Sequence, residues 1–186
     1  MKILGIDPGS LNCGYGLISA QETKSPAGQF EGGRCLKGFV YISSGRIVMQ
    51  ASKPLHERLK DLYTSLSEVI AETAPDEIVI ERMFFAKGVK AALSLGHTRG
   101  VVLLASTLSG FPIFEYSPLE VKQAVVGYGR ADKNQVQSMV KEILKIRHRL
   151  SADGADALAI ALCHANMQGP LSGLSRQLQQ IKVVKR

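Results

Sequence analysis

The chain of 186 residues contains no tryptophan, and aromatic residues make up only 6% of it. Long apolar runs are also missing: uninterrupted stretches such as residues 101–105 are far too short to cross a bilayer. The first residues form an expected strand, with no basic segment leading into an apolar signal core. We therefore expect neither a membrane span nor a secretion signal, and a cytoplasmic location.

Cysteine is scarce as well. The three cysteines, Cys13, Cys35 and Cys163, are odd in number and widely spaced. This pattern disfavours a disulfide framework or a zinc site and is typical of reduced thiols in a cytosolic protein. With 45% hydrophobic and 21% charged residues, the composition is that of an ordinary soluble domain. We expect one folded domain over residues 1–168, followed by a basic tail over residues 169–186.

Acidic residues are few in the second half of the chain, where cations gather. Residues 122–149 hold seven Lys or Arg against two acids, and no acid follows Asp156. The whole chain carries a net charge of +7 and has an isoelectric point near 9.4. A clustered basic surface suits a polyanion, most commonly nucleic acid. The alternative at this point is a soluble protein that is merely basic.

Hydrophobic periodicity predicts a mixed α/β fold. Expected strands are residues 2–7, 14–20, 39–42 with 46–48, 77–80 and 112–116, and a loop is expected over 21–33. Expected helices are residues 54–73, 89–109, 117–126, 132–146 and 151–167. The order of elements predicts a five-stranded mixed sheet flanked by helices, with an antiparallel meander of three strands followed by two parallel strands.

Two of the apolar strands end in an acid. Asp7 follows residues 3–6 directly, and Glu81 follows residues 77–80. Burial of an unpaired carboxylate is costly, so each acid needs backbone donors or a cation. If the two strands are parallel neighbours, both acids emerge at the same carboxyl edge of the sheet, where ligands of open α/β sheets bind.

A third acidic feature is Asp153 and Asp156 in "SADGADALAIAL". Three positions apart, they share one face of the expected helix that Ser151 caps. They could simply complement the helix macrodipole. The apolar residues that follow, however, predict a helix packed into the core, where these acids would be poorly solvated.

Taken together, the four carboxylates predict a metal centre. Carboxylates brought close together repel one another unless a cation neutralises them. Oxygen ligands without a His/Cys cluster favour a hard ion, either Mg²⁺ or Mn²⁺. Two such ions about 3.5–4 Å apart can bind the attacking water and the leaving oxygen of a phosphodiester. A basic surface around this pocket would hold the polyanion.

Five motifs now point to one family. They are "GIDPGSLNCGYG", "IERMFFAKG", "LGHTRG", "YSPLEVKQAVVGYGRADKNQVQ" and "ADGADALAIAL". In order and spacing, from residue 1 to about His164, the chain resembles the RuvC Holliday junction resolvases. The resemblance implies an RNase H-like fold and a bacterial homodimer that works with the RuvA–RuvB branch-migration machinery. It also implies a magnesium-dependent endonuclease that makes two symmetric nicks in a four-way DNA junction, leaving 5′-phosphate and 3′-hydroxyl ends for recombination and repair.

The resemblance also implies roles for individual residues. Asp7, Glu81, Asp153 and Asp156 match the metal-binding acids of the family, with two Mg²⁺ per site and Mn²⁺ as a substitute. Phe84 matches an aromatic residue that engages bases near the crossover. Lys122 and Lys133 match lysines at the DNA, and Lys133 is placed to stabilise charge at the scissile phosphate. Arg99 could line the DNA path.

The chain departs from the family pattern at a few positions. Leu11 and Cys13 stand where Arg and Thr are usual, and Gly154 replaces an alanine between the two helix acids. The loop over residues 21–33 looks longer than its counterpart. None of these departures removes an acid.

Alternatives remain for several residues and for the function. Phe84 and Phe85 could be core residues, Lys122 and Lys133 could be solvated, and His164 is expected to be a satisfied core or interface histidine. One rival function is an ATPase-like domain of the actin/Hsp70 superfamily, although the chain has room for only one such domain and lacks a P-loop lysine motif. Another is a junction-binding protein without catalysis, which would have no use for four converging acids.

Overall fold

The computed structural model describes residues 1–23, 35–82 and 88–168. The strands are β1 (Lys2–Pro8), β2 (Asn12–Thr23), β3 (Cys35–Val48), β4 (Glu77–Glu81) and β5 (Ile113–Tyr116). The helices are α1 (Leu55–Thr73), α2 (Val89–Leu108), α3 (Pro118–Val126), α4 (Lys133–Ile143) and α5 (Ala152–Met167).

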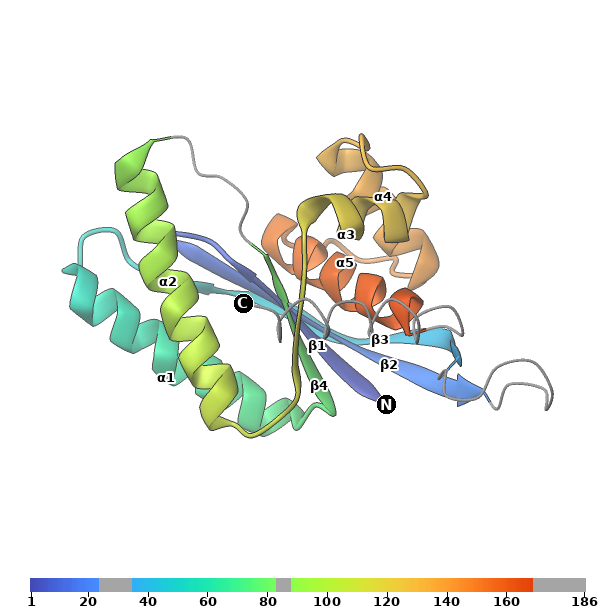
Figure 1. Ribbon diagram of the computed structural model, residues 1–186, viewed down its shortest axis with the longest axis horizontal. Helices are drawn as coiled ribbons and strands as arrows, with labels where there is room; N and C mark the ends of the chain where they lie inside the picture. The colour runs from blue at the N-terminus through green and yellow to red at the C-terminus, as the bar shows by residue number, and fades with distance from the viewer. Residues whose placement is uncertain (24–34, 83–87, 169–186) are drawn as a thin grey trace, which may run out of the picture.

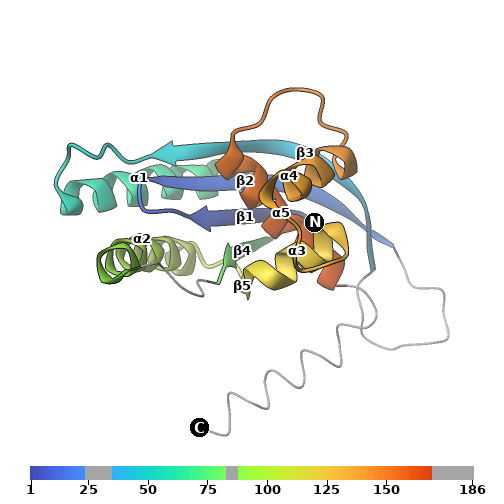
Figure 2. The ribbon, with the colours of Figure 1, turned by 90° about the horizontal axis from the view of Figure 1, so that it is seen from above.

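The five strands form one mixed sheet in the order β3-β2-β1-β4-β5, which Figure 2 shows strand by strand. Strands β1, β2 and β3 pair antiparallel, whereas β4 runs parallel to both β1 and β5. This topology confirms the predicted meander followed by two parallel strands. Ile6 pairs with Ile80 across β1 and β4. Asp7 and Glu81 therefore take the next position of neighbouring strands at the same edge.

Helices cover both faces of the sheet, with α1 and α2 on one side and α3, α4 and α5 on the other (Figure 1). Strand alternation distributes the apolar side chains between the two layers. Leu4 and Ile80 pack in the core beside α1 and α2, whereas Ile3 and Val79 pack in the core beside α5. Asp7 and Glu81 share the alternation of Ile3 and Val79, so both carboxylates face the α5 side.

Three strand glycines face α5 and let it lie directly on the sheet. A Cβ atom at Gly5 would come within 2.1 Å of the Ala157 carbonyl oxygen, and one at Gly14 within 2.1 Å of the Asp153 carbonyl oxygen. At Gly16 the nearest helix backbone atom would be the Leu158 nitrogen, at 2.7 Å. Glycine in a strand often marks such a close backbone approach. The start of α5 is thereby fixed against the ends of β1 and β2.

Some boundaries differ from the predictions. β2 continues through Thr23, so its last residues belong to the sheet and not to the predicted loop, because they pair with the start of β3. β3 is one strand where two stretches were expected. The predicted helix over residues 132–146 ends at Ile143, because the chain reverses at Lys145, whose φ of +53° is incompatible with a continuing helix.

His164 is a core residue, as the sequence suggested. It is fully buried on α5, and its ring nitrogens lie 2.9 Å from the Tyr116 hydroxyl and 2.5 Å from the Glu77 carboxylate. The side chain of Gln168 joins the same buried network. This network ties the last turns of α5 to β4 and β5.

We predict that Gly5→Ala destabilises the protein by about 2 kcal/mol or more, because the new methyl group forces α5 away from β1. Urea denaturation followed by circular dichroism measures the change. A free energy of unfolding within 0.5 kcal/mol of wild type, a margin typical of roughly neutral surface substitutions, would contradict the packing described here.

Candidate active site

A pocket of about 260 Å³ opens where β1, β4 and α5 meet. Three of the four predicted acids line it: Asp7 from the end of β1, Glu81 from the end of β4, and Asp156 from α5. The predicted lysines Lys122 and Lys133 line it as well, from α3 and α4. Its remaining lining residues are Pro118, Val121, Val136 and Ala159. Five predicted site residues that are far apart in sequence thus meet in one pocket.

The first turns of α5 place the two helix acids. The Ser151 hydroxyl caps the helix by accepting from the Gly154 backbone N–H at 3.1 Å. A Cβ atom at position 154 would come within 2.8 Å of that same hydroxyl oxygen. The alanine that is usual at this position would therefore require the Ser151 side chain to shift. The side chains of Asp153 and Asp156 are only 26% and 22% exposed. They are therefore not the freely solvated acids of a surface helix.

The two strand acids are destabilised as anions. Burial, reinforced by the negative charges of Asp156 and Asp153, raises the pKa of Asp7 to about 6, although Lys133 opposes the shift. Burial, together with the charges of Asp7 and Asp156, raises the pKa of Glu81 to about 7. Both values lie well above those of ordinary carboxylic acids. The carboxylates thus act on one another through the pocket, as clustered acids do.

The two helix acids each lie beside a cation of the chain. Lys133 Nζ is 2.5 Å from Asp156 Oδ2, and the amide of Gln137 donates to Asp156 Oδ1 at 3.3 Å. On the other side, a guanidinium nitrogen of Arg46 in β3 lies 3.9 Å from Asp153 Oδ2. Both cations are more than half exposed, which makes these ion pairs weak and easily exchanged.

The candidate ligands of a metal ion at this site are the four carboxylates. Within residues 1–23, 35–82 and 88–168, no three His, Cys, Asp or Glu side chains converge closely enough to hold a metal as they stand. The chemistry of the donor set nevertheless suits a hard divalent cation, because all four candidates are carboxylates. Burial first, and repulsion between the acids second, raise the pKa values of Asp7 and Glu81, and a bound cation would offset both effects. Lys133, beside Asp156, already supplies part of that positive charge from the chain itself.

Arg99 holds the end of β4 in place. Its guanidinium donates to the backbone carbonyl oxygen of Glu81 at 2.5 Å and forms an ion pair with Glu115 of β5. Its side chain is 15% exposed. These contacts give Arg99 a structural role beside the site, and its contact with DNA stays a prediction. Phe84, the predicted base-stacking residue, lies outside the described residues.

Sequence reasoning did not single out Arg46 or Gln137. Arg46 belongs to β3, an edge strand. It is far from Asp153 in the sequence, and no sequence pattern indicates that the two side chains lie close together. Gln137 lies within the quoted motif "ADKNQVQ", four positions after Lys133, and this helical spacing was the available signal. The strand glycines also carried a readable signal, since glycine within a strand indicates a close neighbour.

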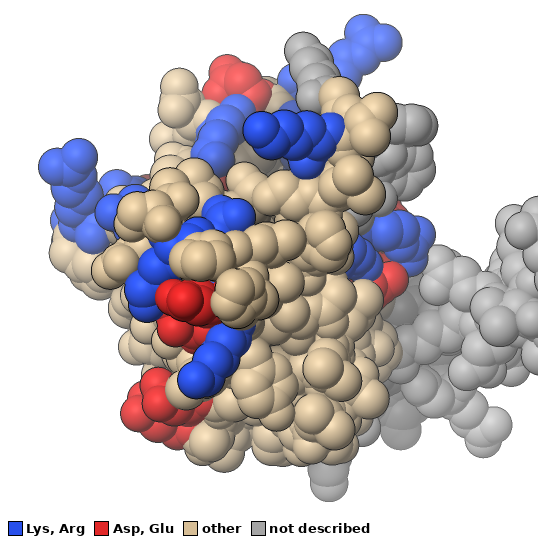
Figure 3. Space-filling view, turned by 90° about the vertical axis from the view of Figure 1, so that its left-hand side faces the viewer, with Lys and Arg blue, Asp and Glu red and all other residues tan. Residues whose placement is uncertain are grey.

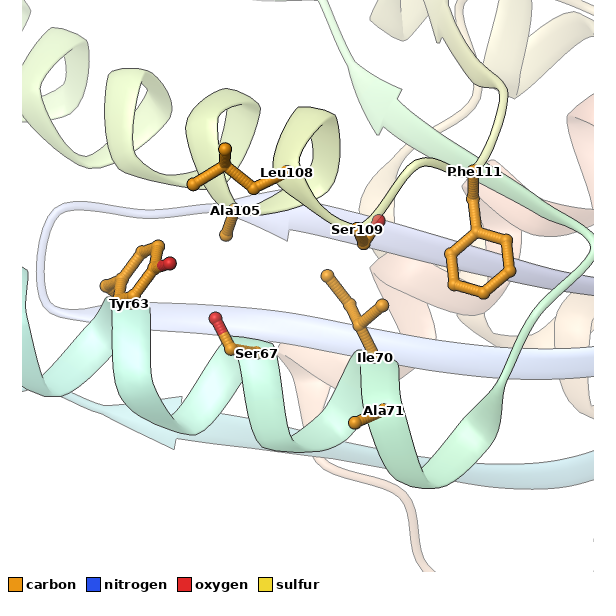
Figure 4. Close-up of a pocket in the computed structure, with 8 residues that line it drawn as sticks. All are labelled: Tyr63, Ser67, Ile70, Ala71, Ala105, Leu108, Ser109 and Phe111. Carbon is orange, nitrogen blue, oxygen red and sulfur yellow. The ribbon is translucent and has the colours of Figure 1, made fainter.

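Basic side chains lie both in the pocket, where Lys122 and Lys133 line it, and elsewhere on the surface. On the face shown in Figure 3, Lys and Arg side chains spread over the upper and middle parts, around smaller groups of acidic side chains. A second pocket, of about 300 Å³, lies between α1 and α2 on the opposite side of the sheet (Figure 4). Its lining includes Tyr63, Ile70 and Leu108 and no carboxylate or basic group. It therefore offers nothing for phosphodiester chemistry.

A carboxylate cluster at the carboxyl edge of a mixed sheet, rimmed by lysines, defines the class as an α/β protein suited to cleaving a polyanionic phosphodiester. Comparison with known proteins makes the class specific. Residues 3–164 match the family model described as crossover junction endodeoxyribonuclease RuvC. The chain belongs to the RuvC family, and its activity is that of an endodeoxyribonuclease acting at crossover junctions.

Individual relatives agree along nearly the whole chain. The RuvC of Citrifermentans bemidjiense is 43% identical over 169 residues, covering 91% of this chain and 94% of that protein. The RuvC of Saccharophagus degradans is 45% identical over 184 residues, covering 98% of each chain. The structure of Thermus thermophilus RuvC has a TM-score of 0.73 and 32% identity, covering 90% of this chain and 95% of that one. These relatives support the endonuclease over the ATPase-like or non-catalytic alternatives.

Among the described residues, no helix is both long and apolar enough to span a membrane. Cys13 and Cys163 are buried free thiols, as expected for reduced cysteines. Burial raises the pKa of each to about 12, so both stay protonated.

The raised pKa of Asp7 predicts that Asp7→Asn stabilises the metal-free protein at high pH. The native state holds the Asp7 proton more tightly than the unfolded chain, so wild-type stability falls as pH rises from about 4 through about 6. In EDTA at pH 8, the variant should therefore be more stable by about 2 kcal/mol. The difference should largely vanish at pH 4.

Urea denaturation at both pH values measures this effect. Glu68→Gln, at an exposed position of α1, is the matched control and should show no such pH-dependent gain. If Asp7→Asn were no more stable than wild type at pH 8, the pKa of Asp7 in the folded protein would not be raised, and the prediction would be wrong.

Proposed function

We propose that this protein resolves four-way DNA junctions by two symmetric, Mg²⁺-dependent nicks that leave 5′-phosphate and 3′-hydroxyl ends. The observation that carries the proposal is the pocket of mutually repelling carboxylates flanked by Lys122 and Lys133. A related protein of 30% identity, T. thermophilus RuvC, has been solved in complex with a Holliday junction substrate. The proposal assigns the nuclease to residues 1–168 and places it in the bacterial cytoplasm.

Asp7, Glu81, Asp153 and Asp156 are the residues that would hold two Mg²⁺ ions, with Mn²⁺ as a substitute. When bound, the ions supply Lewis-acid stabilisation of charge at the attacking and leaving oxygens. Asp7 takes the central role, because its pKa responds to both Asp153 and Asp156. Its neutralisation should therefore disturb the whole cluster.

The remaining steps belong to the side chains around the pocket. The carboxylates align an attacking water in line with the bond from phosphorus to the 3′ oxygen. As the water oxygen bonds to phosphorus and gives up a proton, that bond breaks, and the 3′ oxygen takes up a proton and leaves as a hydroxyl. The side chain of Lys133 is 58% exposed and moves away from Asp156. Its ammonium group then stabilises the negative charge that develops on the phosphate. Lys122 binds the neighbouring backbone without reading its sequence.

Two further DNA contacts belong to the proposal. Phe84, three residues after Glu81, stacks on an unpaired base near the crossover, a contact worth about 1–3 kcal/mol. Arg99 contacts DNA only if its guanidinium is released from Glu115. The RuvA–RuvB branch-migration complex would deliver the junction on which these residues act.

We also propose that the protein acts as a homodimer through α2. Opposite its buried face, α2 carries Val89, Leu93 and Leu104, which are 78%, 59% and 52% exposed. Gly96 and Gly100 lie on the same side, where a Cβ atom would meet nothing within 4 Å. This open apolar stripe suits close packing against a second copy of the helix. Two copies related by a two-fold axis would present two sites to the two opposing strands.

The central test compares wild type with Asp7→Asn on a synthetic four-way junction in Mg²⁺. Wild type should make paired symmetric nicks, and Asp7→Asn should make none while still binding the junction, because neutralising one carboxylate disrupts the cluster without removing the basic surface. Gel analysis of end-labelled strands measures cleavage, and a mobility shift measures binding. Glu68→Gln serves again as control and should cut normally. Cleavage by Asp7→Asn would refute the site, and equal cutting of linear duplex would indicate a general nuclease.

The dimer proposal predicts that Leu104→Glu converts the protein to a monomer, because it buries a charge in an apolar contact. Light scattering after size-exclusion chromatography measures the mass. Thr64→Glu, at an exposed position of α1, is the control and should remain dimeric. A Leu104→Glu variant with the mass of a dimer would exclude this face of α2 as the interface.

A further inference from the structure

Gln137 of α4 contacts one of the acids of the candidate site. Its amide nitrogen Nε2 lies 3.3 Å from Asp156 Oδ1, while Lys133 Nζ lies 2.5 Å from Asp156 Oδ2. An ionised carboxylate can only accept hydrogen bonds, so Gln137 must present the NH₂ side of its amide. One helix therefore holds both oxygens of Asp156, from positions four residues apart.

The helix that carries these donors is itself firmly placed. Its first turn is closed by a capping box, in which Asp132 and Gln135 exchange side-chain-to-backbone hydrogen bonds of 2.9 Å each. Val136 and Val140 are buried in the same core cluster as α5. Gln137 thus projects toward Asp156 from a helix that packing and capping both fix.

The two donors differ in what they can do when a cation arrives. Lys133 carries a positive charge on a side chain that is 58% exposed, so a divalent ion would displace it from the carboxylate. Gln137 is neutral and does not repel a cation. Its hydrogen bond to Asp156 Oδ1 can therefore persist when Lys133 moves away from Oδ2.

We propose that Gln137 is a positioning residue for metal binding: its amide holds Asp156 Oδ1 and so keeps Oδ2 directed at the ion that replaces Lys133. This inference rests on the proposed metal site and adds a residue to it. Partners that orient metal ligands through a hydrogen bond typically change metal affinity or activity by about 10–100-fold when they are removed.

The test uses Gln137→Met, which keeps the length of the side chain and removes the donor. Mn²⁺ binding, followed by the electron paramagnetic resonance signal of the free ion, should weaken by about tenfold. The Mg²⁺ concentration for half-maximal junction cleavage should rise by a similar factor. At saturating Mg²⁺ the cleavage rate should return to within about twofold of wild type, because excess metal compensates for a poorly held ligand.

Gln123→Met, the same substitution at an exposed position of α3, is the control and should leave both titrations unchanged. Equal Mn²⁺ affinity in wild type and Gln137→Met would overturn this inference and leave the proposed function standing. A wild-type protein that binds no Mn²⁺ would instead contradict the metal site. If Gln137→Met melted more than about 4 °C below wild type, its role would be packing, and the inference would also fail.

Discussion

The direct contact between α5 and the sheet is the constraint on which the rest of the structure depends. Helices normally rest on strands through side chains, but here Gly5, Gly14 and Gly16 bring the helix backbone against β1 and β2. The Ala-rich sequence of α5 keeps the helix side of this contact equally thin. Because Asp153 and Asp156 occupy the first turns of that helix, the packing that completes the core also sets the separation of the acids.

Such a site has an electrostatic cost that the fold partly offsets. Four carboxylates near one sheet edge repel one another, and burial together with this repulsion raises the pKa values of Asp7 and Glu81. Lys133 and Arg46 reduce it from opposite sides, on α4 and β3. Both are weakly held and more than half exposed, so the charges that offset the carboxylates remain available for phosphate groups.

Much of this arrangement could be predicted from the sequence. The sheet order, the shared edge of Asp7 and Glu81 and the core position of His164 follow from strand patterns, connection rules and apolar context. Arg46 and Gln137 were missed because their importance arises from distances between elements, which no periodicity encodes. The end of α4 was predicted too late because the residue with the left-handed backbone conformation there is Lys145 and not a glycine, which would have marked the end of the helix in the sequence. Phe84 and the basic tail lie outside the residues that the structure describes.

Arg99 adds a polar link between α2 and the sheet edge that carries the candidate site. It belongs to α2, the helix with the exposed apolar stripe. Its guanidinium donates a hydrogen bond to the backbone carbonyl oxygen of Glu81 and forms an ion pair with the side chain of Glu115. In the proposed dimer, each α2 would thereby be fastened to the strand that carries an acid of its own active site. The helix pair would then hold the two active sites at a fixed distance from each other. The spacing between the two cuts on the DNA would therefore be set by the protein and not by the DNA.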